Sequence, residues 1–245
     1  MGWLLSLAAA ATLVAAWWMP GTAECAALGW TSATLFAVSF LNPQRRILRS
    51  FVAGLLTYTG GFYWLYGTIS DFGGFPFAAA ALIFALFVVG SSVQFIFWAF
   101  AWERLPAWAA RFGLRTALAW LVAYHFWIKI FPWDFGHTQI GFLPLAQIAD
   151  IGGVTVVTFL MLWVTECFAA RRTVSLACRT GSCAALAAAL FYGVAAEQRY
   201  ANPSGVRLKT AMVQGNVSLQ RKHDMSYFTV NQEQYLKTSA HVAER

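Results

Sequence analysis

Charged residues are scarce in this sequence. Only 11% of its 245 residues are Asp, Glu, Lys or Arg, whereas a soluble domain carries about 25%. Hydrophobic residues make up 59%, and they form long runs from Gly2 to about Ala196. Each run is near the ~20 residues with which a helix crosses a ~30 Å hydrocarbon core. This composition excludes a soluble globular protein over that region and predicts a polytopic α-helical membrane protein.

Cysteine is also scarce, and the four that occur follow no ligand pattern. Cys178 and Cys183 are five positions apart with no histidine near them, which does not match the spacing of a zinc site. Cys167 lies near the same membrane face, and Cys25 stands alone, so we expect no disulfide. The sequence predicts neither a metal site nor a bound cofactor.

Ionisable groups are missing from the middle of the apolar runs. The last run has no lysine that could form a retinal Schiff base. No run carries a chain of carboxylates that could move protons. A seven-helix receptor or a proton pump is therefore a poor interpretation.

We predict seven membrane spans. They are Gly2 to Met19, Cys25 to Leu41, Phe51 to Ser70, Phe77 to Trp102, Arg115 to Phe131, Gly153 to Ala170, and Thr180 to Ala196. The last is short and rich in alanine, but it is free of charge and flanked by Arg179 and Glu197. The first is long for a signal peptide and no cation precedes it, so we expect it to be retained.

Arginine marks one side of the membrane. The loops after the second, fourth and sixth spans hold Arg45, Arg46, Arg49, Arg104, Arg111, Arg115, Arg171, Arg172 and Arg179. The alternate loops, up to Ala196, hold one cationic residue, Lys129, near a helix end. Cytoplasmic loops carry the excess of Lys and Arg, so the arginine loops and the N-terminus are predicted to be cytoplasmic. The tail after Glu197 is then periplasmic in a two-membrane bacterium. Since membrane insertion accounts for much of the net charge of +7, we expect no nucleic-acid partner.

Two polar side chains on the fifth span are candidates for a site. His125 and Lys129 are four residues apart, which predicts that they share one helix face near the outer end. They fit a cationic pair that receives a lipid phosphate. They also fit a lysine that reaches the interface beside a histidine satisfied within the bundle, and this second interpretation is favoured.

Other polar residues in the spans have structural interpretations. Glu166 precedes Arg171 and Arg172 by about one helical turn, which indicates an ion pair at the membrane surface. Gln94 and Tyr58, with Ser91 and Ser92, are expected to form hydrogen bonds between helices.

The outer loop "KIFPWDFGHTQIGFLPLAQIADIGG" is too rich in Pro and Gly for a clean helix and too aromatic for a solvated loop. It predicts a segment in the outer interface, with Phe131, Trp133, Phe135 and Phe142 among lipid headgroups.

Two polar residues of this loop, Asp134 and His137, are too few for a metal site or a catalytic triad. We expect Asp134 to cap a turn and His137 to form a hydrogen bond to a headgroup. In the outer loop "SDFGGFP", Gly73 and Gly74 permit positive φ, and Pro76 is predicted to begin the next helix.

Three segments together resemble the apolipoprotein N-acyltransferase family: "GGFYWLYGTISDFGGFP", "FPWDFGHTQIGFLPLAQIADIGGVTVVTFL" and "MVQGNVSLQRKHD". They occur in order along essentially the whole chain. The resemblance implies an enzyme of the bacterial inner membrane that moves an acyl chain from a phospholipid to the N-terminal amine of S-diacylglyceryl-cysteine in a lipoprotein. It also implies eight membrane helices, with a periplasmic nitrilase-like α-β-β-α domain between the seventh and the eighth.

On this plan the chain has three parts. Residues 1–197 form a transmembrane domain, 198–205 a linker, and 206–245 the start of the nitrilase-like (carbon-nitrogen hydrolase) domain, with Val206 to Val217 as its first strand. A tail of this size is expected to need a partner in order to fold.

The family's Glu, Lys and Cys belong to the nitrilase-like domain, and none of the three is expected in this chain. We therefore predict no catalytic residue here. The chain is expected to be a truncated form or one part of a split enzyme completed by a second polypeptide, and to be inactive alone.

The resemblance implies a phospholipid acyl donor and a diacylglyceryl lipoprotein acceptor as partners. Contacts to lipid or substrate are predicted for Gly73, Gly74, His125, Lys129, Phe131, Pro132, Trp133 and His137. Where the family usually has an acidic residue and an arginine before "FPW", this chain has Tyr124, His125 and Lys129, which leaves the headgroup contacts open. The alternative is a non-catalytic membrane anchor or scaffold for a soluble partner, such as a polyprenol-phosphate mannosyltransferase.

Overall fold

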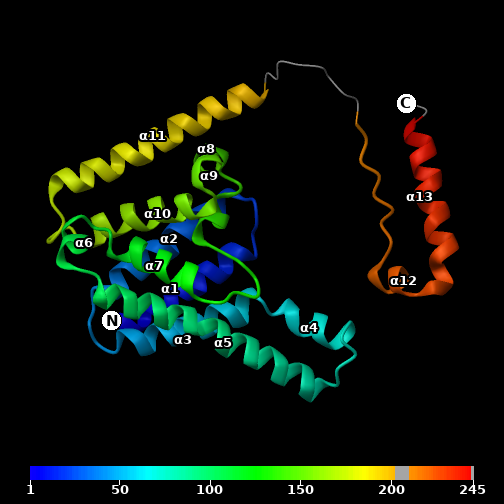
Figure 1. The fold of residues 1–245 in the computed structure, drawn as a ribbon, viewed down its shortest axis with the longest axis horizontal. Coiled ribbons are helices and arrows are strands. Elements are labelled where there is room, and N and C mark those ends of the chain that lie inside the picture. The colour runs from blue at the N-terminus through cyan, green and yellow to red at the C-terminus, as the bar shows by residue number, and fades with distance from the viewer. Residues whose placement is uncertain (202–209, 244–245) are drawn as a thin grey trace. The chain divides into compact units, whose positions relative to one another are not determined.

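The computed structural model describes residues 1–201 and 210–243. The chain divides into two compact units, Met1–Asn202 and Pro203–Arg245, and helices dominate both (Figure 1).

The first unit is a helical bundle whose elements follow the predicted apolar runs. They are α1 (Gly2–Trp17), α2 (Ala23–Phe40), α3 (Arg46–Gly61), α4 (Trp64–Asp71), α5 (Phe77–Arg104), α6 (Ala107–Arg111), α7 (Arg115–Phe126), η1 (Phe135–Gln139), α8 (Leu143–Ala146), α9 (Ala149–Gly152), α10 (Val154–Ala169) and α11 (Leu176–Ala201).

Two of the predicted spans differ from the helices observed. The span Phe51 to Ser70 is wrong as one helix, because α3 ends at Gly61 and α4 begins at Trp64. The break follows a close approach to α1, since a Cβ on Gly61 would collide with the Trp17 ring. The span Arg115 to Phe131 ends early, at Phe126, because Trp127 takes an extended backbone conformation.

The helices differ in whether they are long enough to cross a membrane. Within the described residues, Phe77–Arg104 and Leu176–Arg199 are long and apolar enough to span. The pair Leu143–Gly152 and Val154–Ala169, bent by 118°, makes a third if it is one span. Helix α7 has 12 residues, well short of the ~20 that a perpendicular span needs. The seven-span prediction therefore stays a prediction.

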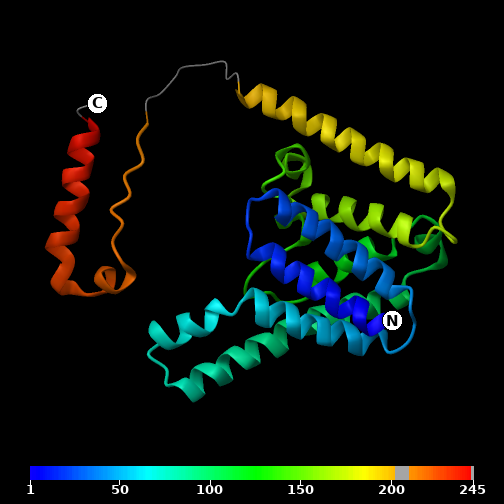
Figure 2. The same ribbon diagram turned by 180° about the vertical axis from the view of Figure 1, so that it is seen from behind.

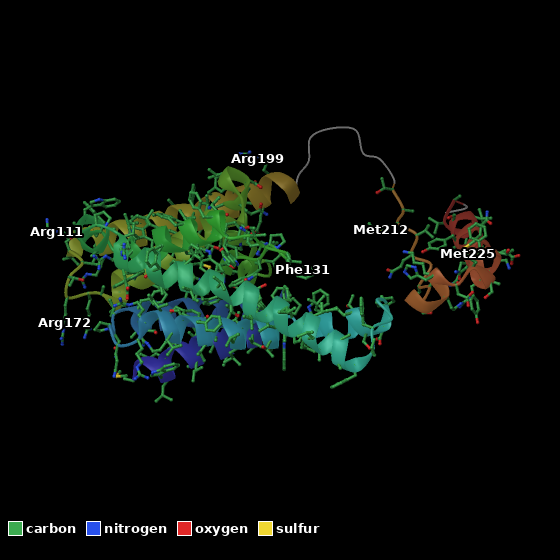
Figure 3. All side chains as sticks on the ribbon, turned by 60° about the horizontal axis from the view of Figure 1, so that its bottom comes forward. Arg111, Phe131, Arg172, Arg199, Met212 and Met225 are labelled. Carbon is green, nitrogen blue, oxygen red and sulfur yellow. The ribbon has the colours of Figure 1, made fainter. Side chains whose placement is uncertain are left out.

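The arginine-bearing loops gather at one end of the first unit. The turn between α2 and α3, helix α6, and the turn between α10 and α11 all lie at the end where the chain begins (Figure 1, Figure 2). Arg111 and Arg172 mark this end, whereas Phe131 lies far along the bundle from them (Figure 3). The alternation of arginine loops in the sequence thus corresponds to a real asymmetry of the bundle.

Small residues bring α1 and α2 together. Ala9 and Ala10 are fully buried, and the Ser32 hydroxyl donates to the Ala9 carbonyl at 2.8 Å. The hydroxyls of Ser6 and Ser39 form a second link between the two helices, at 2.6 Å. Such contacts are typical of helices that associate in a membrane.

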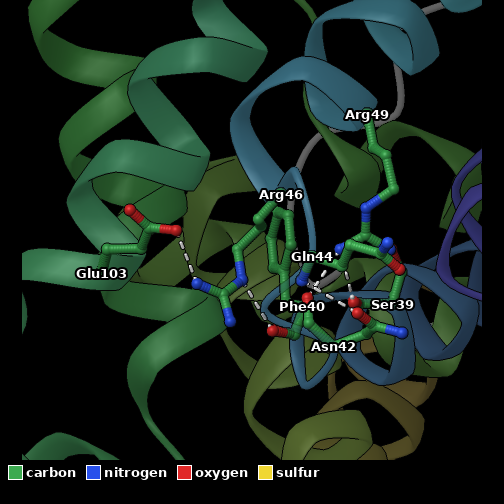
Figure 4. Close-up of polar contacts among 7 residues, drawn as sticks. All are labelled: Ser39, Phe40, Asn42, Gln44, Arg46, Arg49 and Glu103. Carbon is green, nitrogen blue, oxygen red and sulfur yellow. Dashed lines mark hydrogen bonds and ion pairs between the residues drawn. The ribbon is translucent and has the colours of Figure 1, made fainter.

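Two buried arginines, Arg46 and Arg49, form hydrogen bonds between helices at the end of the bundle that carries the arginine loops, which we call the arginine end (Figure 4). Arg46 Nη1 donates to Glu103 Oε1 at 2.6 Å, and its Nε donates to the Phe40 carbonyl at 2.7 Å. Arg49 Nη2 donates to the Asn42 carbonyl at 2.7 Å. These bonds join the start of α3 to the ends of α2 and α5.

The second unit contains α12 (Leu219–His223), η2 (Met225–Tyr227) and α13 (Phe228–Ala243). Gln234 Nε2 of α13 donates to the Gly215 carbonyl at 2.6 Å. The predicted strand is not formed over residues 210–217, because a strand needs a neighbouring strand and the described part of this unit provides none. The rest of that strand, Val206 to Lys209, and residues 202–205 of the predicted linker lie outside the described residues, while residues 198–201 belong to α11.

Candidate functional site

The motif "FPWDFG", residues 131–136, follows α7 and runs into the start of η1, and we call it the FPW turn. Trp133 is 5% exposed and Phe135 is fully buried. The Trp133 ring lies 4.8 Å from that of Trp17 and 5.2 Å from that of Trp120, between centroids. The prediction that Trp133 and Phe135 lie among headgroups is wrong, because both rings find aromatic partners inside the bundle. Phe142 is 41% exposed.

A chain of hydrogen bonds joins Trp133 to α3 and α5. Its indole Nε1 donates to the Tyr58 hydroxyl at 2.9 Å, and that hydroxyl donates to Gln94 Oε1 at 2.8 Å. The predicted bond between helices is thus confirmed for Tyr58 of α3 and Gln94 of α5. Ser92 instead donates to the Val88 carbonyl within its own helix, at 2.6 Å. The chain connects the FPW turn to two helices at once.

Asp134 caps η1, as predicted from its place in the turn. Its Oδ1 accepts from the Phe135 N–H at 2.9 Å and from Trp120 Nε1 at 2.7 Å. His137 completes a capping box, because its Nδ1 accepts from the Asp134 N–H at 2.9 Å. His137 is exposed, so a headgroup contact through its other ring nitrogen stays a prediction.

Burial makes the carboxyl group of Asp134 a weaker acid than usual. The loss of hydration raises its pKa from 3.8 to about 6, against the lowering effect of hydrogen bonds that include those from Trp120 and the Phe135 N–H. Its second oxygen, Oδ2, is buried with no hydrogen-bond partner among the described residues. Trp120 was not anticipated as a partner, because 14 positions separate it from Asp134.

Phe131 begins an open aromatic surface beside the buried Trp133. Its half-buried ring lies 5.7 Å from that of Phe62, 5.5 Å from that of Trp64 and 5.8 Å from that of Phe87. Pro132 is exposed. We call the following set the aromatic rim: Phe131, Tyr63, Trp64, Phe72, Phe75 and Phe77.

The glycine pair lies in the exposed turn between α4 and α5. Gly74 has φ of 65°, as predicted, whereas Gly73 does not have a positive φ, so the prediction was wrong for Gly73. Pro76 is the N-cap of α5. Trp64, the first residue of α4, links this hairpin to Phe131. Gly73 and Gly74 therefore shape the turn that carries the outer part of the aromatic rim.

His125 and Lys129 do not form the predicted pair on one helix face. Helix α7 ends at Phe126, and Lys129 folds back so that its Nζ donates to the Tyr124 carbonyl. The ammonium also lies 4.0 Å from the Tyr124 ring centroid. His125 Nδ1 is 2.9 Å from the Leu121 carbonyl oxygen. Each side chain contacts the backbone near the end of α7, and the shared face is lost because the helix stops between them.

Glu166 has a different partner from the one predicted. It is 2% exposed, and its Oε2 accepts from the Thr116 N–H at 2.5 Å. Thr116 lies in the first turn of α7, where no side chain of the N-cap residue provides a cap. A carboxylate is stabilised by the unpaired amides at such a helix start. The predicted ion pair with Arg171 and Arg172 is therefore wrong.

The described residues provide a shaped apolar surface more than reactive chemistry. No group of three or more His, Cys, Asp or Glu among them is arranged to hold a metal ion. Cys25 and Cys167 are buried, and in the FPW turn Asp134 Oδ1 and the Asp134 N–H form hydrogen bonds within the bundle. What the arrangement offers is a turn anchored inside the bundle with an exposed aromatic surface beside it.

Comparison with known proteins identifies the family of the chain. Residues 2–167 match the family model of the apolipoprotein N-acyltransferase N-terminal domain. This chain belongs to that family. The FPW turn and the glycine turn both fall inside the matched region, so they are parts of the family's N-terminal domain.

Several curated relatives carry the name apolipoprotein N-acyltransferase. The protein from Pseudomonas syringae pv. tomato is 29% identical over 75% of this chain and 38% of its own length. That from Neisseria meningitidis serogroup B is 29% identical over 82% of this chain and 42% of its own length. That from Chromobacterium violaceum is 27% identical over 74% of this chain and 36% of its own length. The chain thus spans about two fifths of the length of these relatives.

Proposed function

We propose that this chain forms the membrane part of an apolipoprotein N-acyltransferase. The enzyme would transfer an acyl chain from a phospholipid to the N-terminal amine of S-diacylglyceryl-cysteine in bacterial lipoproteins. The observation that carries the proposal is the family match over residues 2–167, within which the FPW turn is held rigidly by Trp133 and Asp134.

We further propose a multi-pass topology in the inner membrane. The crossings would be α1, α2, α3 with α4, α5, α7, α10 and α11. The clustering of arginine loops at one end supports a cytoplasmic location for that end (Figure 1). An odd number of crossings then puts the tail after Glu197 in the periplasm.

The aromatic rim is the proposed contact surface for acyl chains. Phe131 and Pro132 would lie at its inner edge, and the turn at Gly73 and Gly74 would support its outer edge. His125, Lys129 and His137 are proposed to face headgroups at the same end. Trp133 acts indirectly in this proposal, because it is buried and its hydrogen bond to Tyr58 anchors the turn that carries Phe131.

The reactive groups would come from a nitrilase-like domain, of which residues 206–245 are proposed to be the beginning. The separate compact unit Pro203–Arg245 supports a domain change near this point. Covalent acyl transfer needs a nucleophile within hydrogen-bond reach of its base. The Glu, Lys and Cys that would meet this need are proposed to be supplied outside residues 1–245, on the same polypeptide or on a second one.

The test uses purified residues 1–245 with labelled phosphatidylethanolamine and a diacylglyceryl-cysteine peptide. Alone, they should form neither a thioester-linked nor an amide-linked acyl group. Adding a separately expressed nitrilase-like remainder should start acylation, and Phe131→Ala in that mixture should slow it. Acylation by residues 1–245 alone would contradict the proposed division of roles. Lipid binding that never leads to acylation in the mixture would favour the membrane-anchor alternative.

A further inference from the structure

The arginine end of the bundle holds a groove separate from the aromatic rim. It has a volume of about 610 Å³, within the range of ~300–1,000 Å³ that is usual for small-molecule sites. Val38 and Leu41, at the end of α2, form part of its apolar wall, and Ala169 and Ala170, at the end of α10, form another part. We call it the arginine groove, because Arg171 and Arg172 also line it.

Both arginines are left without the acidic partner that their sequence neighbourhood suggests. Glu166 turns inward and binds the Thr116 N–H. Arg171 and Arg172 are exposed, and neither side chain forms a hydrogen bond or an ion pair within the described residues. No Asp or Glu is among the described residues that line the groove. The groove therefore presents two positive charges beside an apolar wall.

A second groove at this end has a different charge balance. It is lined by Arg45 and Arg46, but also by Glu103, whose carboxylate pairs with Arg46 at 2.6 Å. The pair cancels one positive charge locally (Figure 4). Of these two grooves, only the arginine groove combines two unpaired guanidinium groups with apolar walls.

We propose that the arginine groove binds an anionic phospholipid. A guanidinium group donates two parallel hydrogen bonds to phosphate oxygens, and basic pockets between membrane helices on the cytoplasmic side bind anionic headgroups. The phosphate would lie between Arg171 and Arg172, and the first carbons of an acyl chain would lie against Val38 and Leu41. Arg172 is far along the bundle from Phe131 (Figure 3), so this lipid is not the acyl donor proposed at the rim.

Lipid binding to purified protein provides the test. Residues 1–245, in a neutral detergent, are titrated with phosphatidylglycerol and with phosphatidylcholine, and bound lipid is counted by native mass spectrometry. We expect phosphatidylglycerol to bind more tightly. The double variant R171Q/R172Q should weaken this binding about tenfold or more. A tenfold rise in Kd corresponds to a loss of ~1.4 kcal/mol in binding free energy.

A matched control separates the groove from general surface charge. R104Q/R111Q removes the same charge from the same end, but neither residue lines the groove. It should change binding less than about threefold, because exposed charges at a distance are screened. R171K/R172K keeps the charge but loses the paired guanidinium donors, so its affinity should lie between those of the parent and R171Q/R172Q. Since Arg171 and Arg172 are exposed, the melting temperature of each variant should match that of the parent.

Three results would overturn the proposal: equal binding of the two lipids, unchanged binding by R171Q/R172Q, or an equal loss in R104Q/R111Q. None of these measurements involves acyl transfer. Failure of the arginine groove and failure of the proposed acyltransferase function are therefore distinguishable.

Discussion

Trp133 and Asp134 are neighbours in the chain, but burial affects their side chains in different ways. The indole of Trp133 gains aromatic contacts and keeps its hydrogen bond through Tyr58. The carboxyl group of Asp134 loses water at one oxygen and replaces it with protein donors at the other. One residue therefore stabilises the FPW turn at any pH, while the other makes its stability depend on pH.

Trp133→Ala is expected to lower the free energy of unfolding by about 3–5 kcal/mol, because it leaves a cavity among packed rings. Trp133→Phe keeps one aromatic ring but removes the five-membered ring of the indole and the donor to Tyr58, so its cost should be smaller, about 1–3 kcal/mol. Thermal unfolding in detergent, followed by circular dichroism, measures both. Equal melting temperatures for the parent and the alanine variant would mean that the ring is not packed as described.

Asp134 predicts a stability that falls as pH rises. Its pKa is raised by burial to about 6, so the folded protein holds a proton that the unfolded chain releases near its ordinary pKa of 3.8. The stabilisation is complete below about pH 4 and is lost as pH rises through about 6, with an upper limit on the order of 3 kcal/mol. Asp134→Asn should remove this component. The measurement is the difference in melting temperature between parent and variant across that range, and a constant difference would contradict the prediction.

At the scale of elements, several helix starts and ends coincide with single contacts from residues outside the helix. α3 stops where Gly61 meets Trp17 of α1, and Lys129 bonds the Tyr124 carbonyl in the last turn of α7. α7 begins where Glu166 of α10 receives the Thr116 amide. The end of α3 and the start of α7 thus depend on a second helix, whereas the end of α7 depends on the loop that follows it.

Glu166→Ala should destabilise the bundle by about 1–3 kcal/mol, because it leaves a buried N–H of α7 without a partner. Glu166→Gln keeps an oxygen in the same place and should cost less. Thermal unfolding compares the two, with R171Q/R172Q as the control. A large loss of stability in R171Q/R172Q would restore the ion pair that the sequence suggested.

At the scale of the whole molecule, the bundle is asymmetric along its length. Arg111 and Arg172 lie at one end, and Phe131 of the aromatic rim lies far from them (Figure 3). Such an arrangement matches a membrane protein with a basic cytoplasmic face and an aromatic outer face.

Reporter fusions test this orientation. Alkaline phosphatase fused after Arg245 should be active, because the enzyme folds only outside the cytoplasm, and the same reporter fused after Arg111 should be inactive. A reversed pattern would overturn the orientation. An inactive fusion after Arg245, together with an active cytoplasmic reporter there, would mean that α11 does not cross.

By itself the sequence determined the helical class, the place of most helices and the family. Long apolar runs with few charges leave no other way to satisfy the backbone in lipid, and the "FPW" and "FGG" segments carried the resemblance that the match over residues 2–167 confirms. The alternation of arginine loops also predicted which loops share an end. Asp134 as a cap, and Tyr58 with Gln94 as a link, followed from simple rules for polar groups.

Only the tertiary structure decided which apolar and polar side chains meet. A helix that is hydrophobic all round does not show which face contacts lipid and which contacts protein. The same holds for an aromatic loop, so the sequence did not predict that Trp133 and Phe135 are buried inside the bundle. Likewise, Glu166 had two nearby arginines in sequence and a helix start nearby in space. The buried amide of Thr116 outweighs the exposed arginines, because a surface ion pair contributes at most about 1 kcal/mol, whereas an unpaired buried donor costs about 1–3 kcal/mol.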